Sequence, residues 1–335
     1  MLRRACPLLV CLLIASCGGS SGAPKAAGGA QWRHFKTLKL VVDLAGPRHD
    51  GRFVANADYR LFLVGTSSAP VPFARGAHGY SGKHVSEAYI AMSQQRRLGG
   101  AGCSFHRDDV YILQSGKSPA IVRVTAGGRA STLAKFPHGG APGAIAFDGV
   151  GSFGHRVLAT AQVGKHFELY AFDCRGHVRT ISKKAPRVEG GIAVAPMTFG
   201  SFGGELIAPD EHSGQIWAIG ADGKSRKLAD SGIPKGGDIG VESAGFAPGK
   251  LGRRIAYLAD RASPGSPTKG TNSILRLKGG ALLKAGVGAG DLIVVAEASA
   301  RTIAVHCAAS CSVREVATGP AAAHAEGHIV FSAPR

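Results

Sequence analysis

The residues best placed to do chemistry are glutamates that recur just ahead of short apolar segments. Each stands three or four positions before an isoleucine or phenylalanine, at Glu87, Glu189, Glu242 and Glu326. Acids that open the same strand in successive copies of a repeat would meet at one end of those strands. Like charges at close range stay ionised only beside a cation, and oxygen ligands suit calcium or magnesium. The pattern predicts a carboxylate-lined site for a divalent cation, either calcium or another metal.

The same glutamates also fit a structural role or a chance recurrence. They could accept hydrogen bonds from backbone N–H groups of the neighbouring repeat, as a packing device, or they could recur without any shared purpose. One copy carries Pro142 at the corresponding position. Carboxylates are common at functional mouths without being diagnostic of them, so a cation site, a packing device and chance all stay open at this point.

Two further segments could add ligands. Asp238 lies in a Gly-Gly-Asp-Ile-Gly turn, and His324, Glu326 and His328 alternate along one segment. In an extended strand such residues share a face and could offer ligands to zinc or a similar ion. His324 could instead lie in the loop before the strand. The pair formed by Asp210 and Glu211 could also contribute, or could form a solvated turn.

The segments that would position these residues form an internal repeat. Ser152-Phe-Gly and Ser201-Phe-Gly belong to two copies spaced about 47 residues apart, each made of short apolar runs and glycine-rich turns. One small sheet of this kind cannot bury its faces until neighbouring sheets stack around it. The sequence therefore predicts an all-β fold, a β-propeller with six blades, or five as the fallback.

Three blades are complete in the sequence, and the remainder are partial. The complete blades have strands expected at 89–92, 109–113, 120–124 and 130–133; at 144–147, 156–159, 168–172 and 177–181; and at 191–194, 205–208, 215–219 and 225–228. Three later runs, 243–246, 254–258 and 273–277, are expected in one blade, with a helical turn at 281–285. Runs at 291–295, 302–305 and 312–316 suggest a further partial blade.

The two ends of the chain are expected to close the ring. Runs at 52–54, 61–63 and 71–74 form a blade that lacks its innermost strand, and 328–331 is an innermost-type strand without a blade. Pairing the C-terminal strand with this N-terminal blade would remove the open sheet edges of an unclosed array.

The first residues have the composition of an export signal. Two arginines precede an apolar stretch that is too short to span a bilayer, and Ile14-Ala-Ser-Cys17 resembles the lipobox of bacterial lipoproteins. We expect a signal peptide at 1–16, lipidation of Cys17, a flexible tether at 17–34 and one propeller domain at 35–335. The protein would then be lipid-anchored on the outer face of the cytoplasmic membrane or in the periplasm. A plain cleaved signal is the alternative.

Four cysteines remain beyond this segment: Cys103, Cys174, Cys307 and Cys311. In an exported protein, four cysteines are candidates for two disulfides. Cys307 and Cys311 flank a three-residue turn and are expected to close a hairpin, which leaves Cys103 for Cys174. Buried free thiols are the alternative.

The chain of 335 residues is strongly basic, with a formal net charge of +18. Its arginine and lysine pairs are scattered and lack the interleaved aromatic residues of a nucleic-acid platform, so no nucleic-acid partner is expected. The charge could be a solvated surface or could attract anionic lipid or wall polymer. No nucleophile elbow or dinucleotide-binding loop is present.

At the level of the blade pattern, residues 50–331 resemble six-bladed propellers of the senescence-marker and gluconolactonase group, the paraoxonases and the NHL-repeat proteins. In the first of these, a glutamate opening an innermost strand helps to hold a catalytic divalent metal for lactone hydrolysis. The resemblance implies that role for Glu87, Glu189, Glu242 and Glu326, with Asp238 as an aspartate ligand, although no asparagine opens a blade here.

The sequence thus predicts a monomeric, membrane-anchored propeller that binds a small ligand or an envelope component at a carboxylate-lined mouth. Its enzymatic version would be a metal-dependent hydrolase of lactones or sugar acids. The alternative is a non-catalytic scaffold that binds protein or envelope polymer.

Replacing Cys17 by serine tests the lipid anchor. The hydroxyl cannot take the place of the lipidated thiol, so the variant should move from the membrane fraction to the soluble fraction on fractionation and immunoblotting. Retention of the variant in the membrane fraction, beside an unaltered wild-type control, would argue for another means of attachment.

Overall fold

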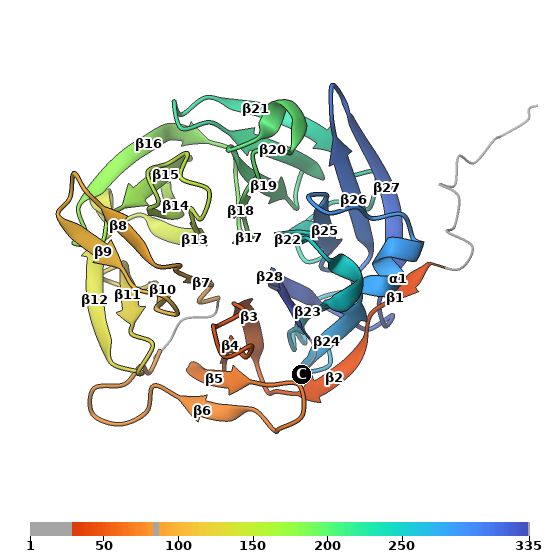
Figure 1. The fold of residues 1–335 in the computed structure, drawn as a ribbon, viewed down its shortest axis with the longest axis horizontal. Helices are drawn as coiled ribbons and strands as arrows, with labels where there is room; N and C mark the ends of the chain where they lie inside the picture. Colours follow the sequence, from red (N-terminus) through yellow and green to blue (C-terminus); the bar gives the residue numbers. More distant parts are fainter. Residues whose placement is uncertain (1–28, 83–86, 334–335) are drawn as a thin grey trace, which may run out of the picture.

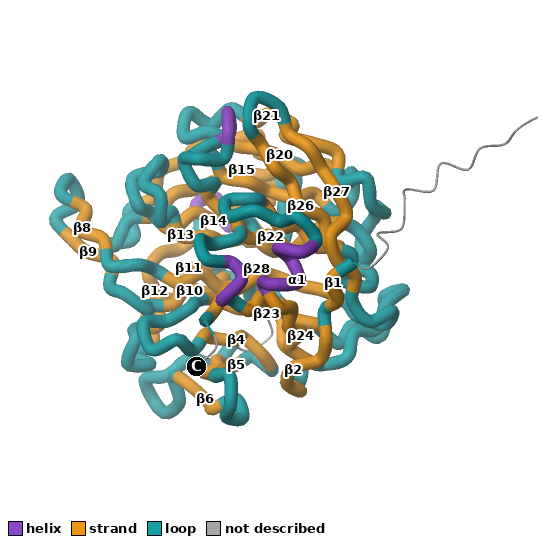
Figure 2. The backbone as a smooth tube through the Cα atoms, turned by 45° about the vertical axis from the view of Figure 1, so that its right-hand side comes forward, coloured by secondary structure: helices purple, strands orange, loops and turns teal. Residues whose placement is uncertain are grey.

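The computed structural model describes residues 29–82 and 87–333, and shows β-sheets arranged like propeller blades around a common centre (Figure 1). Strands and loops make up nearly all of these residues, and the one α-helix among them, α1, is short (Gly279–Lys284) (Figure 2). The all-β, propeller-like fold expected from the repeat is therefore observed.

Four separate sheets have the blade pattern, in which four strands follow one another outward from the centre in chain order; one of these sheets has a fifth strand beyond its first. They contain β3 (Val41–Ala45), β4 (Phe53–Ala57), β5 (Arg60–Val64) and β6 (Val71–Phe73); β7 (Ile90–Met92), β10 (Val110–Gln114), β11 (Ala120–Val124) and β12 (Ala130–Lys135); β13 (Ala141–Phe147), β14 (Val157–Val163), β15 (His166–Phe172), β16 (Val178–Ala185) and the added β17 (Gly190–Gly191); and β18 (Ala193–Val194), β19 (Leu206–Asp210), β20 (Gln215–Ile219) and β21 (Ser225–Asp230). The last three sheets are the three blades that were complete in the sequence.

The fifth large sheet has nine strands and is interleaved. Its order is β1 (Ala30–Gln31), β27 (Cys311–Thr318), β26 (Thr302–Cys307), β25 (Leu292–Ala296), β22 (Val241–Phe246), β28 (Ala325–Ser332), β23 (Ile255–Asp260), β24 (Ser273–Lys278) and β2 (Arg33–Thr37). Its two halves meet where β22 and β28 run parallel, at one bridge between Ala244 and His328.

This arrangement corrects the predicted grouping of the later strands. The run at 243–246 lies in β22, which pairs with β25, whereas β23 and β24, which contain the runs at 254–258 and 273–277, pair with β28 and β2. An apolar run reveals that a strand exists, but its hydrogen-bonding groups are the same for every partner. The predicted helical turn at 281–285 is confirmed as α1.

The predicted closure was wrong in its partner. The N-terminal blade has its own innermost strand, β3, and β28 pairs with β23 instead. The chain ends still share one sheet, because β2 lies at the outer edge of the group that has β28 innermost. Strands β1 and β2 also correct the predicted tether at 17–34, since Ala30, Gln31 and Arg33 already lie in strands and Trp32 is buried.

Both predicted disulfides are confirmed. Cys103 is bonded to Cys174, and Cys307 to Cys311 across the β26–β27 hairpin. The first joins the small hairpin of β8 (Arg96–Leu98) and β9 (Cys103–Phe105) to the neighbouring blade. Two disulfides are typical of an oxidising compartment outside the cytoplasm.

The export signal and Cys17 lie outside the described residues. Among residues 29–82 and 87–333, the structure contains no helix with the length and apolar character of a membrane span.

Apolar clusters fill the spaces between neighbouring sheets. One cluster, for example, joins Tyr111 and Leu113 of β10 to Ala159 of β14 and Tyr170 of β15. Alternate side chains of each strand thus pack against the next sheet around the ring, which is why a single blade could not fold alone.

Asp43 closes the centre of the ring. Its fully buried carboxylate accepts backbone N–H bonds from Leu44 at 2.7 Å, from Ile90 at 2.6 Å and from His328 at 2.6 Å, and so connects β3, β7 and β28. Gly327 lies beside it with φ at 69°, and a Cβ at this position would be 2.2 Å from the Asp43 carboxylate. Two cavities, which we call cups, lie on opposite sides of this closely packed centre and share no described lining residue.

Asp43→Asn should destabilise the protein by about 3 kcal/mol, because the amide replaces one acceptor oxygen with a donor that faces buried N–H groups. Denaturant unfolding would measure the loss. Asp230→Asn, at an exposed acid paired with Lys227, should change the free energy of unfolding by less than about 0.5 kcal/mol. Equal effects of the two substitutions would show that Asp43 does not hold the centre together.

Candidate functional site

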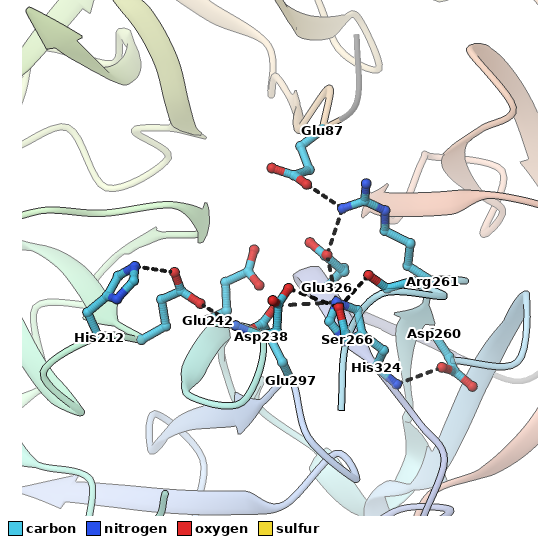
Figure 3. Close-up of polar contacts among 12 residues, drawn as sticks. Glu87, His212, Asp238, Glu242, Asp260, Arg261, Ser266, Glu297, His324 and Glu326 are labelled. Atoms are coloured by element: carbon cyan, nitrogen blue, oxygen red, sulfur yellow. Dashed lines mark hydrogen bonds and ion pairs between the residues drawn. The ribbon is translucent and has the colours of Figure 1, made fainter. Parts of the chain in front are cut away.

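A polar cavity of about 290 Å³ lies at the mouth where the central strands begin. Seven carboxylates line it: Glu87, Glu189, Glu211, Asp238, Glu242, Glu297 and Glu326. Two arginines, one histidine and Tyr89 also contribute to the lining, and Figure 3 shows several of these side chains directed toward one another.

The structure brings all four strand-opening glutamates to this cavity. Glu242 and Glu326 lie within the first residues of β22 and β28, whereas Glu87 and Glu189 lie just before β7 and β17. The central strands begin at the same face of the ring, so equivalent positions converge although they are far apart in sequence. The convergence of the four glutamates that the repeat predicts is therefore observed.

Tyr89 joins the two deepest glutamates. Its phenol oxygen lies 2.6 Å from Glu242 Oε1 and 2.9 Å from Glu326 Oε2, and all three residues are buried. A phenol has one proton and can donate to only one carboxylate at a time. Burial and the charges of Glu326 and Glu297 raise the pKa of Glu242, so its carboxyl can hold a proton of its own. Glu242 can then donate to the phenol while the phenol donates to Glu326.

Arg261, just after β23, is the cation of the deep site. Its Nη1 lies 2.9 Å from Glu326 Oε1 and also bonds Glu87 (Figure 3). Burial alone would raise the pKa of Glu326, but His324 and the Arg261 guanidinium together hold it below its usual value. Glu326 is therefore the member of the cluster that stays ionised.

Glu297 follows β25 and is the least satisfied of the buried acids. One of its oxygens lies 3.4 Å from His324 Nε2, and the other, Oε2, has no hydrogen-bond partner among the described residues. Burial and the nearby Glu326 and Glu211 carboxyls raise the pKa of Glu297 to about 10. A buried carboxyl in this state holds a proton or needs a cation to ionise.

The outer part of the cavity is more exposed and contains Glu189 and Glu211. Burial and the adjacent Glu87 carboxyl raise the pKa of Glu189 to about 8. Glu211 Oε1 lies 2.9 Å from His212 Nε2 and 3.9 Å from an arginine nitrogen of Arg187. This rim therefore carries charges of both signs.

Asp238, His324 and His328 have three different surroundings in the structure. Asp238 is exposed at the rim and accepts a 3.0 Å bond from the Ser266 hydroxyl. His324 is buried among the acids and forms an isolated bridge with Ala298, just before β28 rather than inside it.

His328 was expected as a metal ligand but does not join the cavity. Its Nδ1 lies 2.9 Å from Asp43 Oδ2, on the other side of the central closure. The prediction failed because Gly327 adopts a positive φ of 69°, which breaks the strand alternation that would have placed His328 on the same face as Glu326.

Sequence reasoning missed Tyr89, Arg261 and Glu297 and gave Glu211 little weight. Glu297 and Arg261 follow strands β25 and β23, whose C-terminal ends lie beside the starts of the antiparallel innermost strands. A charged residue that directly ends a buried apolar run was the available signal. The recurrence of the glutamates drew attention only to the innermost strands.

The deep acids have the geometry of a cation site. One ligand oxygen from each of Glu242, Glu297 and Glu326 lies within 4.8 Å of the others, and a second such group combines Asp238, Glu297 and His324. Buried oxygen donors of this number fit a hard divalent cation, and the unpartnered Glu297 Oε2 is a free ligand atom. The residues present therefore fit the metal that the sequence predicts.

Comparisons with known proteins give distant structural similarities only. No family model and no curated protein matches the chain. A streptogramin B lyase structure is 9% identical with a TM-score of 0.47, covering 92% of this chain and 97% of that one. Virginiamycin B lyase from Staphylococcus aureus is 11% identical over 90% and 95%, with a TM-score of 0.43. A gluconolactonase from Xanthomonas campestris is 11% identical over 69% of each chain, with a TM-score of 0.41.

The raised pKa values of Glu189 and Glu297 predict a stability that falls with increasing pH when divalent cations are absent. Both carboxyls keep protons in the folded protein above 4.5, their ordinary value, where the unfolded chain has released them. Their contribution is therefore full at low pH and is lost as the pH rises through about 8 and toward 10. Between pH 6 and pH 9 in chelator, we expect Tm to fall by about 5 °C.

Glu297→Gln removes one of these titrating groups and should make the fall clearly smaller, as measured by differential scanning calorimetry. The matched control is Glu315→Gln on the outer strand β27, which breaks a partly buried ion pair with Arg301 away from the mouth. It should keep the wild-type dependence on pH. An identical fall in all three proteins would mean that Glu297 does not contribute to it, and no fall in the wild type would mean that both acids ionise normally.

Proposed function

We propose that this protein is a six-bladed, envelope-located propeller whose acidic mouth binds a divalent cation together with a small ligand, in the manner of a lactone or sugar-acid hydrolase. The observation that carries the proposal is the trio Glu242, Glu297 and Glu326, which is buried with ligand oxygens within 4.8 Å and in which one oxygen of Glu297 has no partner in the part of the chain that the structure describes. Buried carboxylates this close repel one another, and a cation of two charges relieves that repulsion most directly.

The blade count of six rests on the nine-stranded sheet. Dividing it at the single bridge between Ala244 and His328 gives one group of β22, β25, β26 and β27 and another of β28, β23, β24 and β2. With the four separate sheets this makes six groups of four main strands. The six apolar clusters support the division, because each can be assigned to one contact between successive groups around the ring.

Calcium is the cation that the donors favour. Glu242, Glu297 and Glu326 would hold it with carboxylate oxygens, and calcium accepts six to eight oxygen ligands in irregular arrangements. Arg261 does not replace it, since it pairs with Glu326 and Glu87 and not with Glu297, whose Oε2 has no hydrogen-bond partner among the described residues. Asp238 is close enough to Glu297 and His324 to contribute from the rim.

The remaining lining residues suit a small polar ligand. Arg187 and Arg261 stand at the cavity wall and could bind the carboxylate of a sugar acid, while Glu189 and Glu211 could accept hydrogen bonds from its hydroxyl groups. A bound divalent cation supplies polarisation of a carbonyl oxygen, the chemistry that lactone hydrolysis needs. The cavity, about 290 Å³, lies near the lower end of the range for small-molecule sites.

Export and lipid anchoring belong to the same proposal. The two disulfides support a location outside the cytoplasm, and the predicted lipidation of Cys17 would hold the domain at the membrane. An anchored propeller would meet its ligand in the envelope.

Calcium binding is tested by thermal unfolding of the purified protein after chelator treatment. Millimolar calcium should raise Tm by about 5 °C, because a ligand that binds only the folded state stabilises it by mass action. Glu242→Gln and Glu297→Gln should each remove most of this rise, and elemental analysis should find calcium in the wild type alone. Magnesium, manganese and zinc are measured in parallel to identify the preferred ion.

Glu315→Gln, outside the mouth, should respond to calcium like the wild type. Hydrolysis of a panel of aldonolactones should require the cation and should be lost in Glu242→Gln. A Tm that none of the four metals changes would contradict the cation site and favour the non-catalytic scaffold. Cation binding without hydrolysis would retain the site but reject the hydrolase.

A further inference from the structure

A second cup opens at the opposite mouth of the ring. It has a volume of about 450 Å³ and is lined by the C-terminal parts of the central strands, including Leu44 of β3, Met92 of β7, Phe147 of β13 and Phe246 of β22. The acidic cavity is lined at the other ends of these strands, for example by Tyr89 and Glu242. The two cups therefore lie on the same axis and face opposite directions.

The central closure separates the cups chemically as well as spatially. Asp43 and His328 form the buried pair between them, and a Cβ on Gly191 would lie 2.3 Å from the Gly327 carbonyl oxygen. No side chain lines both cavities among the described residues. A ligand in the second cup would consequently not touch the carboxylates of the first.

The side chains that line the second cup are mostly apolar. Apart from Gln94 and His328, its described lining residues are glycine, alanine or larger apolar side chains, and polar atoms, backbone groups among them, share its surface. His328 is already bonded to Asp43 through Nδ1, and its side chain is only 15% exposed. A cavity of this size with mainly apolar side chains and some polar groups has the usual character of a site for a small molecule with an apolar body.

A polar annex with a basic edge adjoins the cup. It has about 290 Å³ of its own and shares the lining residues Gly46, Met92 and Gln94 with the cup, so the two spaces lie side by side. Arg96 and Arg107 line it from the hairpin of β8 and β9 and the loop that follows.

The positive charges of this annex are not balanced locally. Asp108 is the one acid among its described lining residues, and it already bonds the His49 side chain and accepts the His49 N–H at 3.1 Å. Arg96 donates to the neutral Gln94 amide at 2.6 Å, and neither Arg96 nor Arg107 forms an ion pair with a described residue. An anionic group placed here would find two unpaired guanidinium groups.

We propose that this mouth binds a small amphipathic carboxylate, with its apolar body in the cup and its carboxylate against Arg96 and Arg107. Charge complementarity selects the anion, and the adjoining apolar wall selects the hydrocarbon. The site is separate from the acidic mouth, whose described lining residues are almost all polar or charged and offer no apolar wall for a hydrocarbon. The protein thus has two binding sites of opposite polarity on one axis.

Isothermal titration calorimetry with octanoate tests the proposal, and 1-octanol serves as the uncharged probe of equal chain length. Octanoate should bind at least about fivefold more tightly than octanol. The double variant Arg96→Gln/Arg107→Gln should weaken octanoate binding by about tenfold while leaving octanol binding within twofold. Arg129→Gln/Arg179→Gln, with the same loss of charge at two exposed positions outside the cup, is the matched control and should bind octanoate like the wild type.

Filling the cup gives a second test. Val194→Trp places an indole in the apolar wall and should abolish binding of both probes, whereas Val178→Trp on the exposed outer strand β16 should not. Thermal unfolding confirms that each variant is folded. Absence of octanoate binding to the wild type, or equal octanoate affinity in the wild type and the Arg96/Arg107 variant, would overturn the proposal. Loss of octanoate binding in Glu297→Gln would also overturn it, because it would place the ligand at the acidic mouth.

Discussion

The buried carboxylate of Asp43 is the interaction on which the rest of the structure depends. It accepts backbone N–H groups from β3, β7 and β28, which are separated by up to 285 residues in the chain, and it pairs with His328. A carboxylate without partners at this depth would cost several kcal/mol, so the three strands must stay together to keep it satisfied. The two cavities for which we propose ligands lie on opposite sides of this contact and share no described lining residue.

In the acidic mouth, carboxylates are buried close to one another, which is electrostatically unfavourable. Glu242, Glu297 and Glu326 are each less than 5% exposed, yet Arg261 balances only part of their charge. Apolar residues or fully paired charges at these positions would stabilise the fold better. Unlike Asp43, which is satisfied by backbone donors, Glu297 keeps an oxygen without a partner among the residues that the structure describes. Asp43 therefore has the contacts of an acid that stabilises the fold, whereas Glu297 retains an oxygen that could contact a ligand.

The ring closes by interleaving rather than by simple succession of blades. After β22 the chain crosses to supply β23 and β24 to the neighbouring group, returns through α1 to complete the first group, and ends in β28. The N-terminal β2 then covers the outer edge of the group to which β28 contributes its innermost strand. Segments from both chain ends and from the middle must therefore assemble together, so misfolding of one of these strand groups would disrupt the other. The arrangement also leaves few exposed strand edges.

The sequence by itself determined the repeat, the three complete blades, both disulfides and the convergence of Glu87, Glu189, Glu242 and Glu326. All of these follow from local periodicity, turn residues or equivalent positions in a repeat, which a chain displays in order. Tertiary structure alone decided the partners of β22, β23 and β28, the entry of Glu297 and Arg261 into the site, and the turning of His328 toward Asp43. Those outcomes depend on which strands lie side by side and on the backbone angle at Gly327. Strand pairing uses backbone groups that are the same in every residue, so the sequence pattern could not specify it.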